Sequence, residues 1–153
     1  MMTITKRDAL TIVGLSARTS NNKGKAEKDI PQLWKRFMSE NTLNRIPSKT
    51  DETVYAIYTD YEGDHTKPYT IVIGCSVSNL DDIPEDMTVK MVPEANYTQF
   101  IAKGDLTKDA VINTWMDIWN TDLKRAYTTD IEIYGEKALD PTNGEAEILI
   151  ATE

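Results

Sequence analysis

An internal repeat is the feature that most constrains the fold of these 153 residues. Its start is visible in the letters, because Met2-Thr3-Ile4 returns as Met87-Thr88-Val89. At the same spacing, a second set of apolar positions returns: Ile12, Leu15 and Ala17 recur as Tyr97, Phe100 and Ala102. Each copy continues with a helical pattern and then with two β-rich runs, so the order β-α-β-β occurs twice.

This order predicts an α+β fold of two βαββ repeats related by pseudo-twofold symmetry, repeat one at about residues 1–80 and repeat two at about 85–153. We expect two antiparallel sheets or one continuous sheet, with both helices on one side. Two similar halves that face each other leave a central cleft, a common position for a small-molecule site.

In repeat one, residues 3–16 indicate two short extended runs, broken at Arg7-Asp8. A helix follows the polar loop at residues 21–25, with Asp29 as its expected N-cap and Pro31 in its first turn. Its apolar positions have helical spacing: Ile30, Leu33, Trp34, Phe37 and Met38. Residues 41–47 should end this helix. The runs 54–58 and 71–77 then predict a hairpin around the turn-rich loop 60–68.

In repeat two, Thr107 is the expected N-cap of a second helix, with Asp109 in its first turn and Leu106 and Val111 at the positions of a hydrophobic staple. The apolar face of this helix is wide: Val111, Ile112, Trp115, Met116, Ile118 and Trp119. Residues 130–134 and 145–151 then predict two strands around a loop at residues 140–144.

Composition favours a single domain over residues 1–153, because 40% of the residues are hydrophobic and 27% are charged. No stretch approaches the about 20 apolar residues of a membrane span, and the N-terminus alternates too early for a signal peptide. We therefore expect a cytoplasmic protein. The lone Cys75 lies in an apolar run, which suits a small buried residue better than a disulfide partner.

The net charge of -8 repels phosphate backbones and favours the approach of cations. The charge thus argues against direct nucleic-acid binding and permits a cationic ligand. An acidic surface is also a common route to solubility, so charge alone does not require such a ligand.

The segment Asp130-Ile131-Glu132-Ile133-Tyr134 is the most informative part of the sequence. Strand alternation places Ile131 and Ile133 on one face, which we expect to pack against the helices, and the other three side chains on the opposite face. That opposite face has two interpretations. It is either an ordinary solvated strand face or part of the cleft, where Glu132 would be a carboxylate beside an aromatic ring.

The repeated βαββ order, the Leu33-Trp34-x-x-Phe37 stripe and the late Asp-x-Glu-x-Tyr strand resemble the GyrI-like family, also called AraC-type effector-binding domains. Within it, the chain is most similar to single-domain members, including drug-binding proteins encoded by mobile gene cassettes. The resemblance implies a hydrophobic or aromatic organic cation as ligand. It assigns Glu132 as the counter-ion and Tyr134 as a neighbouring aromatic side chain.

Further aromatic side chains are candidates for the same site: Tyr58 and Tyr61 from repeat one, and Trp115 and Trp119 from repeat two. For the two tryptophans, helical spacing also fits plain core packing. We expect no metal and no cofactor. The only histidine, His65, lies in an acidic loop without EF-hand spacing, and nucleophile-elbow and P-loop patterns are absent from the sequence.

The leading hypothesis is therefore a binding module for organic cations. Any role in transcription would need a separate DNA-binding partner, because the chain leaves no room for a helix-turn-helix. Two alternatives come from the same resemblance. One is a hydrolase of reactive cytotoxins in which Glu132 and Tyr134 activate water. The other is a protein inhibitor of DNA gyrase.

Overall fold

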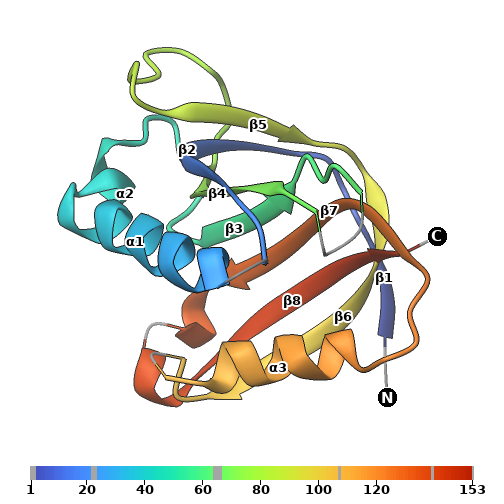
Figure 1. Ribbon diagram of the computed structural model, residues 1–153. Helices are drawn as coiled ribbons and strands as arrows, with labels where there is room; N and C mark the ends of the chain where they lie inside the picture. Colours follow the sequence, from blue (N-terminus) through green and yellow to red (C-terminus); the bar gives the residue numbers. More distant parts are fainter. Residues whose placement is uncertain (1–2, 22–23, 64–66, 107, 139, 153) are drawn as a thin grey trace.

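The computed structural model describes residues 3–21, 24–63, 67–106, 108–138 and 140–152. The strands in these ranges are β1 (Thr3–Arg7), β2 (Leu10–Thr19), β3 (Val54–Thr59), β4 (Tyr69–Ser76), β5 (Thr88–Val92), β6 (Ala95–Gly104), β7 (Arg125–Tyr134) and β8 (Gly144–Thr152). The helices are α1 (Lys25–Ser39), α2 (Thr42–Arg45) and α3 (Ala110–Trp119), with short 3-10 helices η2 (Glu136–Ala138) and η3 (Pro141–Asn143). All eight strands join one antiparallel sheet in the order β1-β6-β8-β7-β3-β4-β2-β5 (Figure 1). The predicted α+β class is confirmed, and the sheet is continuous.

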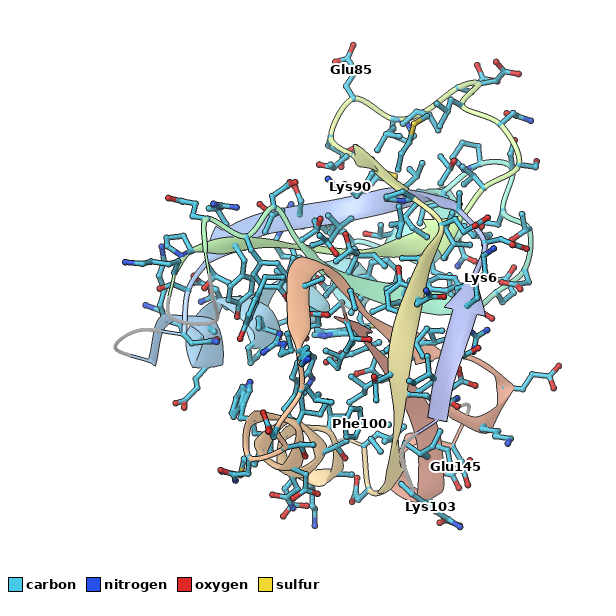
Figure 2. The ribbon with its side chains drawn as sticks, turned by 90° about the vertical axis from the view of Figure 1, so that its right-hand side faces the viewer. Lys6, Glu85, Lys90, Phe100, Lys103 and Glu145 are labelled. Carbon is cyan, nitrogen blue, oxygen red and sulfur yellow. The ribbon has the colours of Figure 1, made fainter. Side chains whose placement is uncertain are left out.

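The first strand of each repeat joins the half of the sheet that belongs to the other repeat. β1 pairs with β6, and β5 pairs with β2; Figure 2 shows β1, with Lys6, alongside β6. Only Asp8-Ala9 connects β1 to β2, and only Pro93-Glu94 connects β5 to β6. Because these short links join opposite ends of the strand order, the sheet is strongly curled.

The strand registers reveal an approximate twofold axis at the centre of the sheet. Residue numbers of β5, β6 and the start of α3 exceed those of β1, β2 and the start of α1 by 85, for example 95 against 10. When the pairing of β2, β4 and β3 is carried over to β6, β8 and β7, Ala56 becomes the counterpart of Glu132, and Tyr58 the counterpart of Tyr134. Ala56 and Glu132 also face each other across β3 and β7. The axis therefore passes between Ala56 and Glu132.

Both helices that contain tryptophan cover the same face of the sheet (Figure 1). Leu33 and Phe37 of α1 share one apolar core with Trp115 and Ile118 of α3 and with side chains of β2, β3, β4, β6 and β8. The prediction that the helices lie on one side is confirmed. The opposite face forms a second core: Ile12, Ile57, Val72, Val92, Tyr97, Ile131, Leu149 and Ala151.

The second core corrects one expectation. Ile131 and Ile133 were expected to face the helices, but Ile131 belongs to the second core and Ile133 packs against it. The reason is the curl of the sheet, which closes the second face into an apolar interior that buries Ile131 and partly buries Ile133. Strand alternation then directs Glu132 and Tyr134 towards α1 and α3.

The start of α1 also differs from the prediction. The helix begins at Lys25 with Gly24 at the N-cap in a left-handed conformation (φ 69°), so Asp29 lies within the helix and is not its cap. Pro31 is correspondingly in the helix interior and not in the first turn. Ala26 explains the earlier start, because it is buried and its N–H donates to the carbonyl of Ser20 at 2.9 Å. The segment expected to end the helix contains the short helix α2.

In repeat two, Thr107 lies outside the described residues. α3 begins at Ala110, and Asp109 is at its N-cap without a side-chain hydrogen bond. β7 begins at Arg125 and not at Asp130. Arg125 pairs with Thr152 of β8, and the register of this pairing shifts before Asp130. Tyr127, between them, has a left-handed backbone (φ 53°), which breaks the alternation that predicts strands.

In the ranges that the structure describes, no helix is long and apolar enough to cross a membrane. The same ranges hold no group of three or more histidine, cysteine, aspartate or glutamate side chains arranged for a metal ion. His65 lies outside the described residues. Cys75 is buried, as its apolar run indicates.

Candidate ligand-binding site

A cleft of about 1890 Å³ lies between α1 and α3 and is lined by residues of both repeats. The helices contribute mainly apolar side chains: Ile30, Trp34, Phe37 and Met38 from α1, and Val111, Ile112, Trp115, Met116 and Trp119 from α3. The central strands contribute polar groups, with Tyr58 from β3 and Glu132 and Tyr134 from β7. Since pockets that bind drug-sized ligands measure roughly 300–1,000 Å³, this cleft has room for a bulky organic molecule.

Glu132 lies at the centre of this cleft and is almost fully buried, with 2% of its surface exposed. Its Oε2 accepts hydrogen bonds from the Tyr58 hydroxyl at 2.8 Å and from Trp115 Nε1 at 2.6 Å. Its Oε1 accepts from the Tyr134 hydroxyl at 2.7 Å. Three donors from β3, β7 and α3 thus hold the carboxylate in one orientation.

The partners of Glu132 are all neutral. Among the described residues, no lysine or arginine forms an ion pair with it. Burial raises the pKa of the Glu132 carboxyl above its ordinary value of 4.5, and the three hydrogen bonds counteract this. Burial also raises the pKa of Tyr58 and of Tyr134 well above 10, and the nearby carboxylate adds to the effect, so both hydroxyls remain donors. The site therefore combines a carboxylate with no positive partner and an apolar environment.

The approximate twofold axis explains how one carboxylate is held from two sides. Tyr58 and Tyr134 are counterparts, and each donates to a different oxygen of Glu132. The counterpart of Glu132 is Ala56, whose small side chain leaves the position beside the axis to a single acidic group. Trp115 breaks the symmetry, because the 85-residue offset makes the aliphatic Ile30 its counterpart.

Aromatic rings continue from Glu132 onto both helices. The Trp34 ring meets Tyr134 edge-on, with centroids 5.1 Å apart, and Trp115 meets Tyr58 at 5.3 Å. Trp119 lies 6.3 Å from Trp115 and is 44% exposed, so it forms part of the cleft entrance. Trp34 is a cleft residue that the sequence interpretation missed. The repeat offset was the available signal, because 85 residues separate Trp34 from Trp119.

A second buried carboxylate, Asp130, lies two residues before Glu132 and differs from it in having a positive partner. Arg125 Nη2 donates to Asp130 Oδ2 at 2.9 Å, and the Tyr61 hydroxyl donates to the same oxygen. The Ala151 N–H donates to Oδ1 at 2.9 Å. Burial raises the pKa of the Asp130 carboxyl, and the Arg125 guanidinium counteracts this. Arg125 also lines the cleft, and no pattern in the sequence pointed to it.

All six nominated residues line the cleft. Tyr58, Tyr134 and Trp115 contact Glu132 directly, and Trp115 is therefore both a core residue and a hydrogen-bond donor. Tyr61 contacts Asp130 and not Glu132. Trp119 lies at the entrance without a hydrogen bond to either carboxylate.

Comparisons with known proteins agree with this architecture. A family model described as Cass2, integron-associated effector binding protein, matches residues 3–152. The crystal structure of an integron cassette protein from the mobile metagenome of Vibrio cholerae is 31% identical, with a TM-score of 0.76, over 99% of this chain and 95% of that one. YobU of Bacillus subtilis (strain 168), a suspected transcriptional regulator, is 28% identical over 97% of this chain and 95% of its own length. SAV2435, solved with tetraphenylphosphonium bound, shares the fold with a TM-score of 0.83 at 18% identity, over 100% of this chain and 94% of that one.

Proposed function

The chain belongs to the Cass2 family of integron-associated effector-binding proteins, and from this premise we propose that its cleft binds hydrophobic organic cations with Glu132 as the counter-ion. The observation that carries the proposal is the unpaired charge of Glu132. A buried carboxylate with only neutral donors is unfavourable, because three hydrogen bonds do not fully replace hydration. A cation that enters the cleft supplies the missing positive charge.

The aromatic residues around Glu132 fit the same ligand class. Tyr58, Tyr134 and Trp115 bind the carboxylate, and Trp34 packs against Tyr134. Each aromatic face can contribute about 0.5–2 kcal/mol to a nearby cation. Apolar side chains of α1 and α3 would contact the organic groups of such a ligand. Tetraphenylphosphonium, the ligand of SAV2435, combines these two properties and is therefore the first compound to test.

Hydrolysis, the enzymatic alternative, would require Glu132 to receive a proton from a water molecule. Tyr58 and Trp115 both donate to Oε2, and Tyr134 donates to Oε1, so the protein's own groups occupy most of the acceptor capacity of the carboxylate. This arrangement favours binding over general-base catalysis. A bound ligand should accordingly be recovered unchanged after prolonged incubation.

The proposal predicts the effect of Glu132→Gln, which preserves side-chain shape and removes the charge. Loss of one partner of a buried ion pair should weaken tetraphenylphosphonium binding by about 2–5 kcal/mol, or at least about 30-fold. Neutral triphenylphosphine oxide should bind the variant and the parent equally. Calorimetric titration of both proteins with both compounds measures this difference.

Glu62→Gln is the matched control, because Glu62 pairs with Arg18 at the surface and does not line the cleft. Its affinity for tetraphenylphosphonium should match that of the parent. The counter-ion role is wrong if Glu132→Gln binds the cation as tightly as the parent does.

A further inference from the structure

Arg125 is, after Glu132, the second charged cleft residue with a largely buried side chain, since the other charged residues that line the cleft are exposed. Its side chain is 8% exposed. Nη2 donates to Asp130 at 2.9 Å, whereas Nε is buried without a hydrogen-bond partner among the described residues. The Tyr127 ring lies against the guanidinium, with 4.5 Å between Cζ and the ring centroid. Arg125 is thus fixed in position. Its guanidinium carries five N–H groups, and the hydrogen bond to Asp130 uses one of them, so donor capacity remains on the terminal nitrogens.

This group is linked to Glu132 through Asp130, its ion-pair partner on β7. Asp130, which holds Arg125, and Glu132 are on the same face of β7, so their backbones are about 7 Å apart. A row of rings connects the two positions, because Tyr69 lies 6.0 Å from Tyr58 at the Glu132 end and 5.6 Å from Tyr61 at the Asp130 end. A single ligand of two or three rings can span this distance.

The two positions differ in net charge. Asp130 neutralises Arg125, so the pair does not repel a cation bound at Glu132. The same ion pair disfavours an anionic ligand group, which would face the Asp130 carboxylate. A neutral oxygen, such as a carbonyl or ether, is the group that an unused guanidinium N–H can bind without disturbing the ion pair.

We propose that Arg125 forms a subsite of the cleft for hydrogen-bond acceptors, and that the chain selects organic cations that carry a neutral carbonyl or ether oxygen in addition to the cationic centre. This inference rests on the proposed binding of cations in the same cleft. It adds a second point of recognition, which fixes the orientation of the ligand as well as its charge.

The experiment compares tetramethylrosamine with tetramethylrhodamine methyl ester, two fluorescent cations that differ by one methoxycarbonyl group. A second pair, tetraphenylphosphonium and its para-methoxycarbonyl derivative, presents the same group in another geometry. The parent protein should bind the ester member of at least one pair about tenfold more tightly, the effect of one hydrogen bond to a charged donor. Fluorescence anisotropy and calorimetry give the dissociation constants.

Arg125→Lys keeps a positive charge for Asp130 and removes the guanidinium with its spare terminal N–H groups. In this variant the preference for the ester should fall to about twofold or less, while the affinity for the non-ester cation stays within about threefold of the parent. Arg18→Lys is the matched control, because Arg18 is 41% exposed, pairs with Glu62 and does not line the cleft. It should keep the full preference for the ester.

Three results separate the outcomes. Equal affinity of the parent for both members of both pairs overturns the subsite, even if Arg125→Lys does not fold. If a folded Arg125→Lys variant loses the same factor of affinity for ester and non-ester cations, the subsite is also overturned, since Arg125 then has a purely structural role. If none of the four cations binds to the parent protein, the proposed function itself is contradicted. Glu132→Gln should weaken both members of a pair equally and leave their ratio unchanged.

Discussion

Glu132 and Asp130 are two buried carboxylates on the same strand face with different electrostatic environments. Asp130 has a guanidinium, a tyrosine hydroxyl and a backbone N–H as partners, and its ion pair is complete. Glu132 has only neutral donors. The ion pair of Asp130 with Arg125 spans the β7 irregularity, whereas Glu132 has no ion-pair partner among the described residues.

The raised pKa of Glu132 predicts a pH dependence of stability. The unfolded carboxyl titrates near its ordinary value of 4.5, and the folded carboxyl titrates at a higher pH. Between these two values the folded state binds more protons than the unfolded state, so the free energy of unfolding falls as pH rises through this window. Glu132→Gln has no such proton to lose. The variant should therefore gain stability relative to the parent as pH rises above 4.5.

Urea unfolding of parent and Glu132→Gln at a series of pH values measures this difference. Contributions from Asp130 occur in both proteins and cancel in the comparison. A constant difference in the free energy of unfolding from below pH 4.5 to pH 7 would show that the folded state does not shift the titration of Glu132.

At the scale of the elements, β2 and β4 approach each other unusually closely at one point. Gly14 and Gly74 face each other in their ladder, and Gly14 also faces Thr88 of β5. A Cβ atom on Gly74 would lie 2.1 Å from the carbonyl oxygen of Val13, and one on Gly14 would lie 1.9 Å from that of Ile73. The two glycines therefore permit a backbone contact that any other residue would obstruct.

Gly74→Ala should consequently lower the free energy of unfolding by about 2–4 kcal/mol, because backbone atoms cannot move aside as a flexible side chain can. Gly135→Ala is the control, since the nearest atom to its added Cβ is a Thr53 side-chain oxygen at 3.7 Å. Thermal and urea unfolding of the two variants check the prediction. Equal stability of both would mean that the β2–β4 contact is easily relaxed.

Periodicity predicted most elements and their buried faces, but not which strands are neighbours. Apolar alternation is the same whether β1 pairs within its own repeat or with β6, so the exchange of first strands leaves no signal in one sequence. Alternation also does not specify which face of a sheet the helices cover. Ile131 is buried as expected, but on the face opposite to the helices. The start of α1 was missed because polar residues preceding Asp29 resemble a loop.

The candidate site was partly predictable for similar reasons. Strand alternation and the family resemblance pointed to Glu132, and the hydroxyls of Tyr58 and Tyr134 donate hydrogen bonds to it. The hydrogen bond from Trp115 depends on how α3 packs on the sheet, which helical spacing cannot specify. Arg125 lies beside a residue with left-handed backbone, where no periodic pattern operates.

For the whole molecule, the exchange of β1 and β5 makes each half of the sheet depend on the other repeat. The outer strand next to β6 comes from repeat one, and the outer strand next to β2 comes from repeat two. The central pairing of β3 with β7 adds a further contact between the repeats. The two repeats therefore cannot separate without breaking ladders in both halves.

This arrangement predicts a single cooperative unfolding transition. Two variants report on the repeats separately. One keeps Trp34 as its only tryptophan and reports on repeat one, and the other keeps only Trp115 and Trp119 and reports on repeat two. Their fluorescence should give coincident urea midpoints, because neither half keeps its sheet without the other. Separate midpoints would show that each half is stable on its own despite the exchanged strands.

Because the axis passes between Ala56 and Glu132, a homodimer of two identical repeats could not place a single carboxylate beside it. In such a homodimer both positions beside the axis would carry the same residue, with backbones only about 4.5–5.5 Å apart. Two glutamates there would repel, and one would keep its proton; two alanines would leave no charge at all. Because a single chain carries both repeats, an alanine can face a lone glutamate. Under the proposed function, tandem covalent linkage thus sets a stoichiometry of one monovalent cation per chain, because one such cation balances the Glu132 charge.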